Sequence, residues 1–136
     1  MTTKVEDIVA AIKTTLTNAG ITVRDNTDAL YSFEDKPVVV VSPGDEIPAP
    51  VVGQGFVYWD MEVSLLIGAD GDEPKLAPEP IRQAAHAALY ADRTLGGVVI
   101  DLHVLRVTRN IDSENPAAGI TEAVYQFKYR VLENTV

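Results

Sequence analysis

The sequence predicts a single α+β domain in which a mainly antiparallel β-sheet packs against two α-helices. The chain has 136 residues, a length typical of one domain, and no internal repeat divides residues 1–136. Two stretches have apolar residues at helical spacing, and others alternate apolar and polar residues as strands do. The expected order is α-β-β-β-α-β-β. Helices set apart from runs of strands are typical of α+β folds.

The first helix is expected over residues 3–19. Thr2 or Thr3 serves as the N-cap, and Gly20 stands where a helix stop belongs. A short strand is expected to follow at residues 21–25. One apolar stripe follows the helical spacing: Val5, Ile8, Val9, Ile12 and Leu16.

A second short strand is expected over residues 37–41, which begin with a proline followed by four valines. Residues 42–55 hold three prolines and three glycines and are therefore predicted to form a long loop. Three aliphatic residues on this segment, Ile47, Val51 and Val52, make it a candidate protein-interface loop. A loop folded back over the core accounts for them equally well.

The clearest strand is predicted over residues 56–69, where Tyr58, Asp60, Glu62 and Ser64 alternate with the apolar residues of the other face. This pattern fits an antiparallel sheet with one packed face and one wetter face. Residues 70–80 are expected to form an acidic, proline-rich loop. The residues of the packed face are Val57, Trp59, Met61, Val63, Leu65 and Ile67.

A second helix is expected to begin at Pro80, a residue that suits the first turn of a helix. Gly96 and Gly97 follow it and allow a backbone with positive φ at the helix stop. The strand predicted at 98–110 changes its apolar phase, which indicates a β-bulge near Val104. A narrow face of small residues is expected on the helix: Ile81, Ala84, Ala85, Ala88 and Leu89.

A final strand is predicted over residues 120–133, after a turn at residues 112–119. Its core-facing residues are expected to be Ala123, Tyr125, Phe127, Tyr129 and Val131, with Glu122, Gln126, Lys128 and Arg130 facing outward.

The formal net charge is −9, from 11 basic and 20 acidic residues. Domains that grip nucleic acids depend on lysine and arginine at the phosphates, so this balance argues against such a domain. The chain has no cysteine, which excludes disulfides and zinc–thiolate sites. The apolar runs are shorter than the ~20 residues that span a bilayer, and the N-terminus lacks signal-peptide features. A soluble protein made in the cytoplasm is expected.

Few residues point to catalysis. Asp60 and Glu62 share a strand face, as ordinary solvated carboxylates also do. Residues 69–73 lack the ligand spacing of a calcium loop. His86 is expected on the solvated side of the second helix, and His103 among strand aliphatics. No enzyme activity, metal or cofactor is therefore expected.

Several segments occur in a recognisable order along the chain. The first is the N-terminal helix followed by "GITV", and the next are the "PVVVV" strand and the long aromatic strand. The alanine-rich helix ending "LYADRTLGGVV" follows, and then two strands around "IDSENPAAG" that close on "VYQFKYRV". Taken together, these segments resemble the tail terminator proteins of long-tailed bacteriophages, the minor tail protein U-like family, and the resemblance covers nearly the whole chain as an order of elements.

The resemblance implies a ring, expected to be hexameric, at the head-proximal end of a phage or prophage tail. Such a ring stops polymerisation of the tail tube protein, joins a head-completion or neck protein, and lets DNA pass without specific binding. We hypothesise that Asp70, Asp72 and Glu73 line the opening and repel the DNA. Replacing all three with lysine is then expected to slow DNA ejection, and normal infectivity would contradict the hypothesis.

Three alternatives remain open. A head–tail connector or neck protein would leave tail length normal when lost, whereas loss of a terminator gives overlong tails. A small intracellular protein-binding module would be a stable monomer that retains a host protein. An enzyme built on Asp60 and Glu62 would lose its activity when both residues are replaced by alanine.

Overall fold

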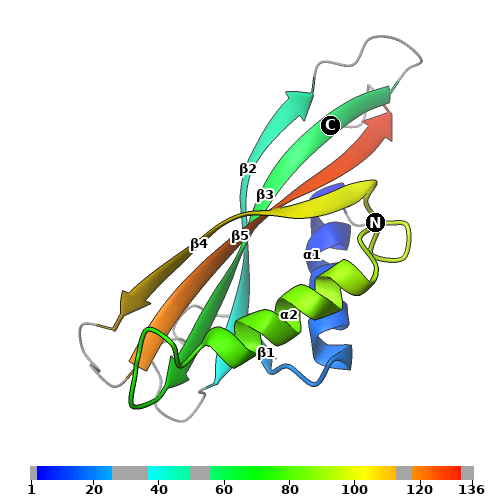
Figure 1. The fold of residues 1–136 in the computed structure, drawn as a ribbon. Helices are drawn as coiled ribbons and strands as arrows, with labels where there is room; N and C mark the ends of the chain where they lie inside the picture. Colours follow the sequence, from blue (N-terminus) through cyan, green and yellow to red (C-terminus); the bar gives the residue numbers. More distant parts are fainter. Residues whose placement is uncertain (1–2, 26–36, 50–55, 113–117, 133–136) are drawn as a thin grey trace.

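The computed structural model describes residues 3–25, 37–49, 56–112 and 118–132, and these residues form two helices and a five-stranded sheet (Figure 1). The elements in chain order are α1 (Lys4–Asn18), β1 (Val23–Arg24), β2 (Val38–Ala49), β3 (Phe56–Asp70), α2 (Glu79–Ala91), β4 (Asp101–Ile111) and β5 (Ala118–Leu132).

The strands lie in the order β1-β2-β3-β5-β4. The pairs β2–β3, β3–β5 and β4–β5 are antiparallel, and only the two-residue strand β1 pairs in parallel, with β2. Both helices pack against one face of this sheet, where they share a hydrophobic core with it. The predicted α+β class and the order α-β-β-β-α-β-β are confirmed.

Helix α1 has the start, stop and buried stripe that the sequence predicts. Thr3 is the N-cap and forms a capping box with Glu6, in which the Glu6 N–H donates to Thr3 Oγ1 at 3.2 Å. Gly20 follows the helix with a φ of +82°. The fully buried members of the stripe are Ile8, Ile12 and Leu16.

Strands β3 and β5 carry the centre of the core, because they pair along their whole length and alternate in phase. This confirms the two clearest strand predictions. Trp59 and Val131 pack against the same cluster but are only partly buried. The buried core-facing residues of the two strands are Met61, Val63, Leu65, Ile67, Ala123, Tyr125, Phe127 and Tyr129.

The opposite face of the sheet also buries apolar side chains at one end, beyond what the alternation predicts. Val38 and Val40 form a small second cluster with Leu66. Val124, in the neighbouring strand, is 1% exposed. This end of the sheet is therefore packed on both faces.

The predicted β-bulge is confirmed in β4. The register to β5 shifts between Val104 and Arg106, and the extra residue, Leu105, is 39% exposed. The strand begins later than predicted, because residues 98–100 still belong to the turn after α2. In that turn Val99 is buried and Ile100 is exposed. This is the reverse of the alternation in the sequence, which predicts Val98, Ile100, Leu102 and Val104 on one face.

The predicted loop over residues 42–55 is wrong for residues 42–49, which continue β2 as far as Ala49. The long β3 supplies a complete hydrogen-bonding partner, and one bulge between Pro43 and Glu46 absorbs the irregularity. Pro43 and Pro48 are tolerated because both occupy positions whose backbone faces away from β3. As a result, the far ends of β2, β3 and β5 run on past both helices (Figure 1).

Candidate interaction surface

The two strand carboxylates singled out in the sequence lie in cross-strand ion pairs. Asp60 Oδ1 is 4.0 Å from Lys128 Nζ, and Glu62 Oε1 is 3.7 Å from Arg106 Nη1. Each carboxylate therefore faces its own cationic partner, on the face of the sheet opposite the helices. Among the described residues, no group of three or more histidine or acidic side chains is placed to hold a metal ion.

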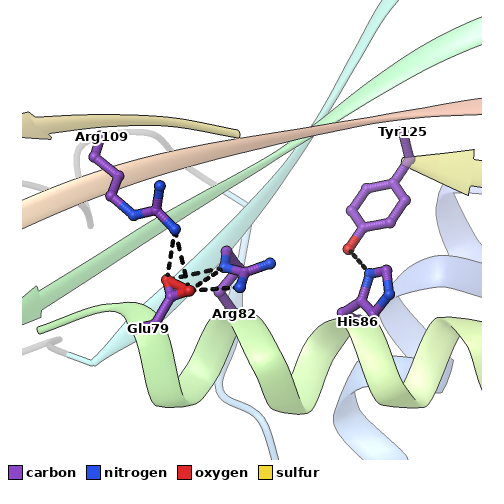
Figure 2. A network of polar contacts seen from close by, with 5 residues as sticks. All are labelled: Glu79, Arg82, His86, Arg109 and Tyr125. Carbon is purple, nitrogen blue, oxygen red and sulfur yellow. Dashed lines mark hydrogen bonds and ion pairs between the residues drawn. The ribbon is translucent and has the colours of Figure 1, made fainter. Parts of the chain in front are cut away.

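Helix α2 is fixed to the sheet at its first turn by one carboxylate shared between two arginines (Figure 2). Arg82 Nε donates to both oxygens of Glu79, at 2.8 and 2.9 Å. Arg109, from β4, donates to the same two oxygens at 3.1 Å. The hydrogen bond from Arg82, reinforced by Arg109, lowers the pKa of Glu79 to about 2, against the opposing effect of burial.

His86 lies against the sheet, so its predicted place on the solvated side of the helix is wrong. Its Nδ1 is 2.9 Å from the hydroxyl of Tyr125 (Figure 2). Its ring stacks on that of Tyr90, with the centroids 4.1 Å apart. Burial raises the pKa of Tyr125 to about 12, so this phenol stays protonated. His103, by contrast, is exposed on β4.

The turn after α2 is held by Asp92. Its carboxylate accepts hydrogen bonds from the backbone N–H groups of Thr94 and Gly96, at 3.1 and 2.8 Å. Leu95, Gly96 and Gly97 have φ values of 51°, 71° and 92°. The two glycines thus allow consecutive residues with positive φ, as their position in the sequence predicts.

The same turn covers the first half of the edge of β4. Arg93 donates to the carbonyl oxygen of Leu102 at 2.8 and 3.1 Å and also pairs with Asp101. The Val104 N–H donates to the hydroxyl of Tyr90 at 3.0 Å. Both backbone groups point away from β5. The side chains of Arg93 and Tyr90 therefore make the hydrogen bonds that a further strand would make at this edge. The sequence contained no signal for this edge cap, since it depends on how α2 lies.

The second half of β4, Arg106–Ile111, is different. Asp112 N–H donates to the Ala118 carbonyl, which shows that even-numbered residues face β5 here. The backbone groups of Val107, Arg109 and Ile111 therefore face outward. Among the described residues no strand pairs with this edge. We call Arg106–Ile111 the open half of β4.

The other long edge of the sheet belongs to β2. Strand β1 pairs only with Val39 and Val40, so among the described residues nothing pairs with the edge over Pro43–Ala49, which we call distal β2. Glu46 faces the helix side, where it accepts a hydrogen bond from the hydroxyl of Tyr129. This bond and burial raise the pKa of Tyr129.

The candidate interface residue Ile47 lies on distal β2 and is 64% exposed. Its predicted loop is a strand, but its exposure fits an interaction role. Val51 and Val52 lie outside the described residues. The candidate opening residues Asp70, Asp72 and Glu73 are all exposed, where β3 ends and the following turn begins.

A hollow of about 270 Å³ lies between the end of α1 and the start of α2. Thr22 is the one lining residue with a polar side chain, so the hollow offers few groups to orient a polar substrate. The lining is made by Ala19, Gly20, Ile21, Thr22, Pro37, Val38, Val39, Pro80, Ile81 and Ala84.

Within the described residues, neither helix is long and apolar enough to cross a membrane. No protein-family model matches the chain, and no curated protein matches it either.

Proposed function

We propose that the protein is a structural subunit of virion assembly in a long-tailed phage or prophage. In this proposal, copies of the chain form a ring, expected to be hexameric, that caps the head-proximal end of the tail tube. The ring stops addition of the tube protein and presents a surface to a head-completion or neck protein.

The observation that carries this proposal is that one sheet has two unlike edges with which no strand of the described residues pairs. A ring of identical subunits needs two different surfaces that fit each other, because each copy contacts one neighbour on each side. Distal β2 and the open half of β4 lie on opposite edges of the sheet. A shared core of two helices and five strands holds both edges in fixed relation.

The charge of the chain supports the same role. A net charge of −9 opposes tight binding of DNA phosphates, and a ring through which DNA moves must not hold it. Asp70, Asp72 and Glu73 are exposed together at one end of β3 and remain candidates for the rim of the opening.

Tail length tests the proposal. Deleting the gene from the phage or prophage that encodes the chain is expected to give overlong tails, measured by electron microscopy of the particles. Tails of normal length that fail to join heads would assign the protein to the neck instead. Normal, infectious virions would contradict any role in assembly.

A further inference from the structure

We propose that distal β2 of one copy docks against the open half of β4 of the next copy, so that the two sheets become continuous. The occupant of each edge is thus a second copy of this chain. This inference deepens the proposed function, on which it rests, by naming the contact between neighbours. Three observations support it, on hydrogen bonding, charge and exposed apolar residues.

The hydrogen-bonding capacity of the two edges differs. Of the outward-facing residues in distal β2, Pro43 and Pro48 have no N–H and offer only carbonyl oxygens, whereas Glu46 offers both groups. Among these residues, two copies of distal β2 therefore have only the Glu46 N–H of each copy as a donor for pairing with each other. The open half of β4 holds no proline, and its outward N–H groups supply the donors that the β2 carbonyls need.

The charges of the two edges are opposite. Distal β2 has two acidic residues, Asp45 and Glu46, and no basic one. The open half of β4 has two arginines, Arg106 and Arg109, and no acidic residue. Pairing an edge with its own copy brings like charges together, whereas pairing the unlike edges brings opposite charges together.

Arg106 has hydrogen-bonding capacity left for such a contact. Its side chain is 58% exposed, and its one ion pair within the described part of the chain is the 3.7 Å contact with Glu62. A guanidinium carries five N–H donors, so Arg106 has donors free for a carboxylate of a neighbour. Asp45 is exposed in the β2 bulge and offers such a carboxylate.

Each of the two edges also exposes one large aliphatic side chain. Ile47 is 64% exposed on distal β2, and Ile111 is 47% exposed at the end of the open half of β4. Edge pairing would bring these side chains out of water in the same contact that pairs the charges.

Cross-linking tests the contact directly, because the chain has no cysteine and every introduced thiol is unique. Ile47→Cys and Thr108→Cys replace exposed, uncharged side chains on the two edges. The two purified variants, with tags of different size, are mixed and treated with a short bis-maleimide. We expect the mixed dimer to exceed both homodimers. A matched control, Thr14→Cys, places a thiol on the exposed side of α1, outside distal β2 and the open half of β4.

Charge reversal provides the second arm. Asp45→Arg added to the Ile47→Cys chain is expected to lower the yield of mixed dimer about fivefold, because a repulsion replaces an attraction at the edge. Arg106→Glu added to the Thr108→Cys chain is then expected to restore it. Circular dichroism of each variant shows that the fold is kept.

A dominant Thr108→Cys homodimer would overturn the proposal in favour of two-fold pairing of β4 with itself. A mixed dimer no more abundant than with the Thr14→Cys control would overturn it too, as would a yield that does not change with the charge reversals. Tail length is scored separately. If the mixed dimer forms but deletion of the gene leaves tail length normal, the contact between copies is supported and the proposed function is rejected.

Discussion

At the scale of single residues, Glu79 links the first turn of α2 to strand β4. It joins two arginines from different elements, and they hold its pKa at about 2 instead of the ordinary 4.5. The folded state therefore stabilises the charged form of Glu79 more than the unfolded state does. The stabilisation is fully present above about pH 4.5 and is lost as the pH falls through about 2.

We therefore expect Glu79→Gln to lower the free energy of unfolding by about 2 kcal/mol at pH 7. We also expect it to flatten the dependence of stability on pH between about 4.5 and 2. Urea denaturation across this range measures both effects. Glu73→Gln is the matched control, because Glu73 is exposed in the turn before the helix. If the stability of the Glu79→Gln variant falls with acid as steeply as that of the unchanged protein, Glu79 is not the source of this pH dependence.

Residue-level prediction succeeded where the physics is local. The Thr3 cap and the stop at Gly20 depend only on neighbouring residues, and both were predictable. The placement of His86 failed, because the helical apolar stripe does not reveal that Tyr125, far along the chain, presents a hydroxyl to this helix. The Glu79–Arg109 bond escaped prediction for the same reason.

At the scale of elements, the turn between α2 and β4 decides how the helix crosses the sheet. A Cβ added at Gly96 would meet nothing within 4 Å, so only its φ of +71° resists substitution. We expect Gly96→Ala to destabilise the fold by about 1 kcal/mol, and Gly96→Asn by less, because asparagine tolerates positive φ better.

Denaturation midpoints of the two Gly96 variants test this expectation. The asparagine variant serves as the control, since it adds a larger side chain at the same open position. Equal losses for alanine and asparagine would mean that the side chain, and not the backbone angle, sets the cost.

Strands were predictable where apolar and polar residues separate clearly onto the two faces of the sheet. The alternation in β3 and β5, and the phase slip that marks the β4 bulge, are written in the residues themselves. Residues 42–49 were misassigned because proline and glycine usually break strands. A long partner strand and a bulge accommodate them here, and neither is visible in the local sequence.

At the scale of the whole molecule, what matters is which edges of the sheet remain uncovered. Tyr90 and Arg93 cover the first half of β4, while the second half and distal β2 stay unpaired within the described residues. Edges left uncovered on a small sheet favour pairing with other chains unless they are protected. Two unlike uncovered edges favour head-to-tail association over two-fold dimers.

The most direct test of the ring is the mass of the purified protein by light scattering over a wide range of concentrations, followed by electron microscopy of the largest species. We expect a particle near six subunits with a central hole, and we expect Asp45→Arg to weaken its formation. A closed dimer at every concentration would contradict this expectation, because two-fold pairing occupies the surface that a ring requires.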